Sequence, residues 1–134
     1  MRRCRGDEGS ATAELVVAFP MFLFMIMLIV QAGLYFHAVG VASAAAQEGA
    51  RAARHQGATI EEGEAEAREF VQALAPRLFV NPVEVTGDPV GTDRVRMTVT
   101  GQVIQVFVIP GANIDFTVRE SSEGPVERFR PDPP

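Results

Sequence analysis

The first part of the chain contains a long apolar stretch that carries no charge. No Asp, Glu, Lys or Arg occurs between Glu14 and Glu48, and residues 15–36 are rich in Leu, Ile, Val, Phe and Met. A helix over residues 15–36 would be about 33 Å long at 1.5 Å per residue, which is enough to cross a hydrocarbon core of about 30 Å. The pattern therefore predicts a membrane-spanning helix over about residues 15–36.

The Ala-rich segment after the span is expected to continue this helix. Residues 37–54 consist largely of good helix formers and contain no Pro. Gly57 suits the left-handed position that often follows the end of a helix. We therefore predict one helix over about residues 10–56. Pro20 has no amide hydrogen to donate, so we expect it to kink or loosen the helix one turn inside the membrane.

Small residues recur along the predicted helix and would let another helix approach closely. They are Gly33, Gly40, Ala44, Gly49 and Ala53. The alternative is that they reflect only the Ala- and Gly-rich composition of the chain.

Residues 59–75 have the pattern of a second helix. Thr59 and Glu62 match a capping box, in which each side chain accepts a hydrogen bond from the other residue's backbone N–H. Phe70, Val71 and Leu74 would fall on one side and form its apolar face. Five Glu residues lie in its first part, and we expect them to form a solvated face.

Beyond Val80 the apolar positions change to a period of two, which is typical of half-buried strands. About four short strands are expected, near residues 83–85, 95–99, 103–109 and 114–118, with a turn at Gly87-Asp88-Pro89. They would form a small antiparallel sheet packed against the second helix. The fold class is therefore α+β. The expected organisation is a leader at 1–9, the long helix at 10–56, a small α+β domain at 57–120 and a disordered polar tail at 121–134.

Charge suggests how the chain would sit in a membrane. Arg2, Arg3 and Arg5 lie just before the apolar stretch, whereas the first Arg residues after it are Arg51 and Arg54. Because basic residues next to a span stay in the cytoplasm, we expect a single-pass protein with its N-terminus inside and its C-terminus outside. The net charge of −5 argues against a general nucleic-acid partner.

The junction between the leader and the span is the most informative short motif. Gly9 and Ser10 are followed by Glu14 at the start of the apolar helix. A cut after Gly9 would make Ser10 the new N-terminus and Glu14 the fifth residue, which is the pattern of type IV prepilins. The Glu14 carboxylate could then pair with the Ser10 ammonium of a neighbouring subunit and set the register of assembly. The alternative is that Glu14 merely favours the N-terminal end of the helix dipole.

Two stretches together resemble a known family. Residues 9–20 read GSATAELVVAFP and residues 44–54 read AAAQEGARAAR. Both are similar to the pattern of TadE-like proteins, although Leu15 stands where Phe is usual. The matching positions are Glu14, Pro20, Glu48, Gly49, Ala50 and Arg51.

The resemblance implies a minor pilin or pseudopilin of a bacterial tight-adherence (Flp) pilus. Its expected partners are membrane lipid, other pilins or Tad assembly proteins, and a prepilin peptidase that cuts between Gly9 and Ser10. The expected location is the inner membrane, with incorporation in an extracellular pilus left open. One alternative is an uncleaved membrane-anchored part of the assembly machinery. Another is a secreted soluble domain, released by conventional signal cleavage near Ala42-Ser43-Ala44.

The sequence offers no residues arranged for catalysis. His37 and His55 have no Cys or carboxylate at metal-ligand spacing, and no nucleophile motif or phosphate-binding Gly loop is present. We therefore expect no catalytic residue, no metal and no cofactor, and we expect that the chain is not an enzyme.

Overall fold

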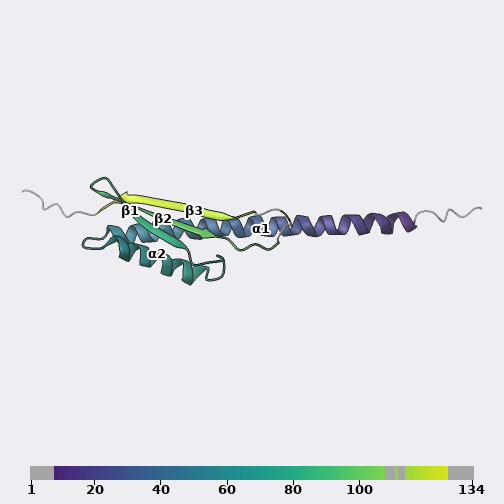
Figure 1. Cartoon of the computed structure of the whole chain (residues 1–134), viewed down its shortest axis with the longest axis horizontal. Helices are drawn as coiled ribbons and strands as arrows, with labels where there is room; N and C mark the ends of the chain where they lie inside the picture. The colour runs from purple at the N-terminus through teal and green to yellow at the C-terminus, as the bar shows by residue number, and fades with distance from the viewer. Residues whose placement is uncertain (1–7, 108–110, 112–113, 127–134) are drawn as a thin grey trace, which may run out of the picture.

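The protein is a long helix that carries a small α+β head beside its C-terminal half (Figure 1). The computed structural model describes residues 8–107, 111 and 114–126, with side chains from Thr12 onward. The elements are α1 (Glu8–Arg54), α2 (Ile60–Leu74), β1 (Glu84–Val90), β2 (Arg94–Gln102) and β3 (Thr117–Pro125). The α+β class is confirmed, but the sheet has three strands where about four were expected.

Helix α1 agrees closely with the long helix expected from the sequence. It runs from Glu8 to Arg54 and passes through Pro20 without interruption. The turn after it contains Gly57 at a φ of +85°, a left-handed conformation that Gly adopts without a steric cost. Most of the expected leader, residues 1–7, lies outside the described part of the chain.

Helix α2 begins at the capping box expected from the sequence. The Thr59 hydroxyl accepts from the Glu62 backbone N–H at 3.2 Å, and the Glu62 carboxylate accepts from the Thr59 backbone N–H at 3.0 Å. Its apolar face agrees with the prediction in part: Val71 is buried and Phe70 is partly buried, but the other buried residues are Gly63 and Ala67. Leu74 is exposed. The side of α2 that faces α1 carries the small residues Gly63 and Ala67, which let the two helices approach closely.

The sheet is antiparallel and has the order β1-β2-β3. Gly91, at a φ of +68°, lies in the turn between β1 and β2. In the register, Val85 faces Val99 and Gly101 faces Val118. These residues are on the face toward the helices, and the opposite face carries mainly polar and charged side chains.

The turn expected at Gly87-Asp88-Pro89 is wrong, because all three residues lie inside β1. Pro89 is tolerated there because β1 is an edge strand, which leaves one side of its backbone without a ladder. Gly87 serves a close approach, since a side chain at this position would collide with Ile60 of α2.

The strand expected at 103–109 is also wrong over its described residues. Val103 makes one isolated bridge with Phe79, and residues 104–107 leave the sheet. Residues 108 and 109 lie outside the described part. The strand expected at 114–118 begins later, at Thr117, and it continues to Pro125.

The polar tail therefore does not begin at Ser121 as expected, because residues 121–125 belong to β3. This strand is held by its complete ladder with β2, from Thr117 opposite Gln102 to Pro125 opposite Arg94. Residues 127–134 of the expected tail lie outside the described part.

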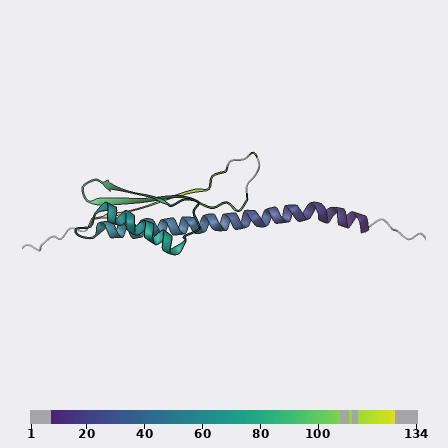
Figure 2. The same ribbon diagram turned by 60° about the horizontal axis from the view of Figure 1, so that its bottom comes forward.

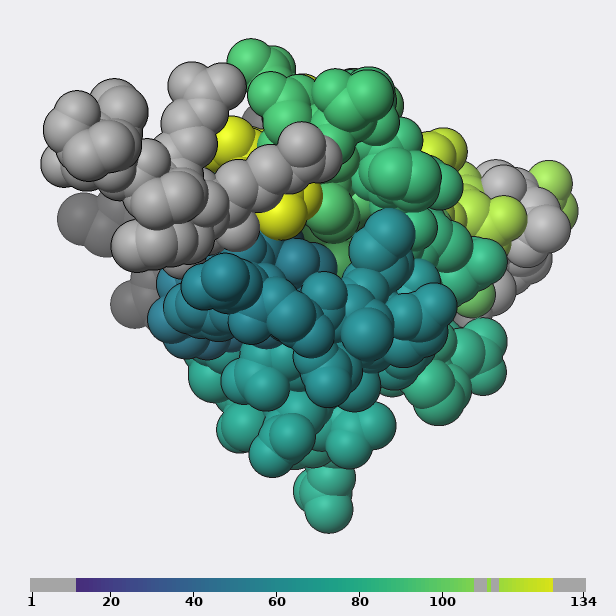
Figure 3. All heavy atoms as spheres, turned by 90° about the vertical axis from the view of Figure 1, so that its left-hand side faces the viewer, coloured from purple at the N-terminus to yellow at the C-terminus, as the bar shows by residue number. Residues whose placement is uncertain are grey.

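The two helices form one layer and the sheet forms the other. Seen from the end of the head, the blue and teal helical residues lie together below the green residues of the sheet (Figure 3). The sheet was expected to pack on the second helix, but β2 and β3 lie chiefly on α1, and β1 lies on α2. One face of α1 forms most of its side of the core, through Ala38, Val41, Ala42, Ala45, Ala46, Ala50 and Ala53.

Candidate functional site

The first family motif lies on the part of α1 that projects beyond the head. The backbone is already helical at Gly9 and Ser10, and Glu14 is exposed one turn further along. No residue in the described part of the chain is paired with the Glu14 carboxylate. Gly9, Ser10 and Glu14 therefore lie in the first turns of α1, and the Glu14 side chain is open to other molecules.

The helix between Glu14 and the head exposes its apolar side chains in every direction. Each large apolar residue from Leu15 to Val30 is at least 40% exposed. Among the described residues, α1 is the one helix that is long and apolar enough to cross a membrane. A helix that is apolar all round needs a membrane or a protein partner around it.

The second motif, Glu48 to Arg51, lies where α1 crosses α2. A methyl group added at Gly49 would lie 2.7 Å from the Gly63 carbonyl oxygen and 2.8 Å from the Ala67 methyl. These distances are shorter than van der Waals contact, so only Gly permits this crossing. Ala50, the next residue of the motif, is buried. The motif therefore positions the head on the helix.

The outer residues of this motif form an ion pair on the helix surface. The Arg51 guanidinium donates to both oxygens of the Glu48 carboxylate. This hydrogen bonding holds the pKa of Glu48 below its usual value. Because the pair lies at the surface, with the Arg51 side chain 59% exposed, it contributes little to stability.

The expected stripe of small residues is divided between two environments. Gly49 and Ala53 pack against Gly63 of this chain's own α2. Gly33 and Gly40, by contrast, have nothing within 4 Å of the position that a Cβ would occupy. They lie on the side of α1 that faces away from the head, and this side remains open to another helix.

Gln31 is a structural residue that the sequence analysis did not single out. It is 2% exposed, although it lies in the apolar stretch. Its side-chain amide donates to the Ile104 carbonyl oxygen at 3.2 Å and accepts from the Val106 N–H at 2.9 Å. The available signal was that Gln31 is the one side-chain amide within the apolar residues 15–36.

Glu64 departs from the expected solvated acidic face because it connects α2 to the sheet. Its carboxylate accepts from the Gly87 backbone N–H at 3.0 Å and from the Arg68 guanidinium at 2.8 Å. The Gly87 bond lowers the pKa of Glu64 most; partial burial opposes this shift, and Arg68 adds to it.

Because the pKa of Glu64 is lower in the folded state, its contribution to stability is complete above its unfolded pKa and is lost as the pH falls through the folded value. Glu64→Gln should therefore destabilise the head by about 1 kcal/mol at pH 7, and the difference from the wild type should shrink below about pH 4. Denaturant unfolding of the detergent-solubilised chain at both pH values measures this. An unchanged difference at acidic pH would contradict the role assigned to the Glu64 charge.

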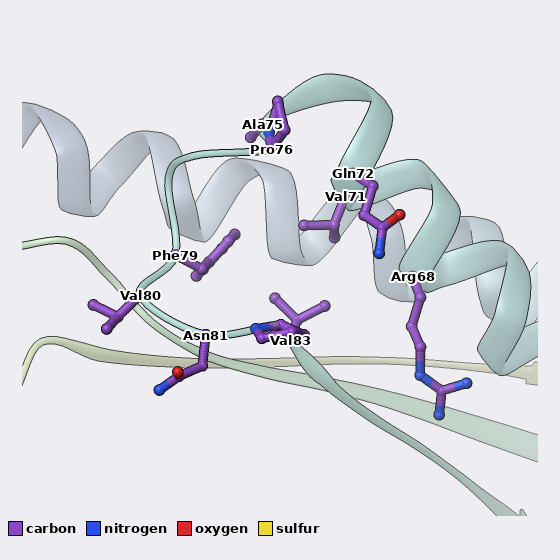
Figure 4. Close-up of a pocket in the computed structure, with 10 residues that line it drawn as sticks. Arg68, Val71, Gln72, Ala75, Pro76, Phe79, Val80, Asn81 and Val83 are labelled. Carbon is purple, nitrogen blue, oxygen red and sulfur yellow. The ribbon is translucent and has the colours of Figure 1, made fainter.

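A hollow of about 460 Å³ lies between α2 and the segment that leads into β1 (Figure 4). Phe79 and Val83 point toward the helices, while Arg68 extends toward β1, where it donates to the Val85 carbonyl oxygen at 3.1 Å. The residues that line this hollow all belong to the described part of the chain, and none of them is Ser, Cys, His, Asp or Glu. The hollow therefore offers apolar contact but no group for nucleophilic or acid–base chemistry.

Comparison with known proteins bears on the helix that carries both motifs. The family model described as TadE-like protein matches residues 9–51, which run from the predicted cleavage junction to the end of the second motif. No curated protein and no solved structure matches the chain. Residues 9–51 of this chain are therefore a TadE-like segment, in agreement with the resemblance seen in the sequence.

Proposed function

We propose that this chain is a minor pilin or pseudopilin of a tight-adherence pilus, anchored in the inner membrane by the projecting half of α1. The observation that carries the proposal is the continuous run of exposed apolar side chains from Leu15 to Val30 on a helix whose other half holds a folded head. The TadE-like match covers this helix as far as Arg51. A TadE-like segment indicates a component associated with a Tad pilus.

The proposed role is structural and begins with processing of the leader. A prepilin peptidase hydrolyses the amide bond between Gly9 and Ser10, leaving a carboxylate on Gly9 and an α-ammonium on Ser10. The membrane then holds α1 until the subunit joins an assembly. Removal of the leader takes Arg2, Arg3 and Arg5 away from the cytoplasmic end, which lowers the cost of withdrawing the helix from the bilayer.

Docking in the assembly follows from the chemistry of the new N-terminus. A carboxylate inside an apolar assembly is costly unless it is paired. The Ser10 ammonium of a neighbouring subunit would supply the partner that Glu14 lacks among the described residues of its own chain. The open side of α1 at Gly33 and Gly40 allows the helix of that neighbour to approach closely.

The two alternatives make different demands on the same helix. A secreted domain cut near Ala42-Ser43-Ala44 would lose the core residues Ala38 and Val41, and the remaining part of α1 would begin inside the core of the head. This burial argues against the secreted domain. An uncleaved part of the assembly machinery would keep both α1 and the head, so the two membrane-anchored roles are separated by processing and incorporation.

Fractionation of the native host cells tests the proposed location and role. We expect the protein to stay in the membrane pellet after alkaline carbonate washing and to dissolve in detergent, because the apolar half of α1 is embedded. We also expect part of it in filaments sheared from the cell surface. Release by carbonate would contradict the membrane anchor, and complete absence from sheared filaments would favour the uncleaved machinery component.

A further inference from the structure

The chain returns from the sheet to lie beside the apolar half of α1. We define the return segment as the described residues 103–107 and 114–116, which leave β2 and lead back into β3. Figure 2 shows the chain leaving the sheet beside α1 in the direction of its N-terminal half. The rings of Phe107 and Phe24 are 5.7 Å apart, and those of Phe116 and Tyr35 are 6.4 Å apart.

These ring contacts place the return segment along the axis of the span. Phe24 lies eleven residues before Tyr35, a distance of about 16 Å along the helix at 1.5 Å per residue. Tyr35 is suited to the membrane–water interface, where aromatic residues with a polar group are enriched. If α1 crosses the bilayer, Phe107 lies at the depth of Phe24, near the middle of a hydrocarbon core about 30 Å thick.

Non-helical backbone at this depth needs hydrogen-bond partners, because hydrocarbon supplies none. The Gln31 amide supplies them: it donates to the Ile104 carbonyl oxygen and accepts from the Val106 N–H. Gln105 satisfies one further backbone group across the return segment, since its side-chain amide donates to the Ile114 carbonyl oxygen. These side chains satisfy backbone groups that water would otherwise have to reach.

The chemistry of the return segment also matches lipid. No Asp, Glu, Lys or Arg occurs from Met97 to Ile114. Val106 and Ile114 are both 43% exposed. The first carboxylate after this stretch, Asp115, is next to Phe116 near the expected interface, where it accepts from Gln102 at 3.0 Å.

From these observations we propose that the return segment is a second lipid-contacting part of the anchor, inserted in the outer leaflet beside α1 and held there by the Gln31 amide. Its exposed side chains, Val106 and Ile114, contact acyl chains. A groove of about 510 Å³ between α1 and the segment from Ile114 to Thr117 gives an acyl chain room to lie against the helix. The proposal rests on the membrane anchor proposed above, and it adds a wedge that fixes the depth and rotation of the head.

Lipid quenching in vesicles tests this proposal with the full-length chain. The protein carries Cys4→Ser and one new cysteine, labelled with bimane, and is reconstituted alone in phosphatidylcholine and phosphatidylglycerol vesicles. Val106→Cys reports on the return segment, Ile29→Cys on the exposed side of α1, and Ser121→Cys on the exposed face of the sheet. Chain-brominated phosphatidylcholine quenches labels within the hydrocarbon, and aqueous iodide quenches labels in water.

We expect lipid quenching at Val106→Cys to be within about twofold of that at Ile29→Cys, because both lie in hydrocarbon, and we expect iodide to quench only Ser121→Cys. Lipid quenching at Ile29→Cys with iodide quenching at Val106→Cys would overturn the inserted segment and leave the anchor intact. No lipid quenching at Ile29→Cys would overturn the anchor itself. Shielding of Val106→Cys from both quenchers would indicate contact between copies and would also overturn lipid contact.

A second variant tests the Gln31 clamp. Gln31→Leu keeps α1 apolar but leaves the Ile104 carbonyl and the Val106 N–H without partners. We expect lipid quenching at Val106→Cys to fall at least about twofold in this background, because unpaired backbone groups are excluded from hydrocarbon. Quenching at Ile29→Cys should be unchanged. Equal quenching at Val106→Cys with and without Gln31 would overturn the clamp.

Discussion

Gly49→Val should unfold the head or leave it close to unfolding. The added Cβ would lie 2.7 Å from the Gly63 carbonyl oxygen, which is backbone and cannot move aside without shifting α2. Overpacking of this kind costs about 1–3 kcal/mol and occasionally more. We expect the upper end of this range, because the β-branched side chain has few rotamers with which to escape the contact. A small head has little stability to lose.

Gly40→Val is the matched control, because it makes the same substitution in the same helix. Nothing lies within 4 Å of the Cβ position at Gly40. Its stability should therefore equal or slightly exceed that of the wild type, since Gly is a poor helix former. Denaturant unfolding in mild detergent, followed by far-UV circular dichroism, compares the two variants. Equal midpoints for Gly49→Val and Gly40→Val would show that the crossing is not as tight as the geometry indicates.

Glu14→Gln should abolish incorporation into filaments while leaving the subunit processed and in the membrane. The variant keeps the size of the side chain and removes its charge, so the neighbour's Ser10 ammonium would be buried without a partner. Removing one member of a buried ion pair costs about 3–5 kcal/mol. At about 1.4 kcal/mol per tenfold change, subunit docking should weaken by a factor of about a hundred to a few thousand.

Glu48→Gln is the control for this second prediction, because it neutralises a carboxylate on the same helix that pairs with Arg51 at the surface. Exposed pairs contribute little, so this variant should assemble normally. The readout is the ratio of protein in sheared filaments to protein in the membrane, after intact mass has shown that both variants are processed. Normal incorporation of the Glu14→Gln variant into filaments would contradict the proposal that Glu14 sets the register of assembly.

The sequence predicted the helices well because their signals are local. The charge-free stretch predicted most of α1, and Thr59 with Glu62 predicted the start of α2. Gly49 was recognised as part of a motif, but its purpose depends on Gly63, which is distant in sequence. The crossing of α1 and α2 could not be predicted because small residues do not identify the partner that they will contact.

The sheet was predicted less well because its edges lack an apolar pattern. The inward positions of β3 after Val118 are Glu120, Ser122 and Gly124, and the Arg54 side chain lies against Gly124. Backbone pairing with β2 holds this strand. Its sequence after Val118 shows no alternation of apolar and polar residues from which a strand could be predicted. The apolar residues near Val106 suggested a strand, because a segment that packs along an apolar helix has the same apolar composition as a buried strand.

The N-terminus of the native, membrane-extracted protein tests the central claim most directly. Intact mass and N-terminal sequencing should show a chain that begins at Ser10, because processing removes the leader before α1 enters an assembly. A chain that begins at Met1 or Arg2 would contradict the processed-pilin account and favour a permanent membrane anchor. A start near Ala45 would contradict both membrane-anchored roles, since it would remove the apolar half of α1.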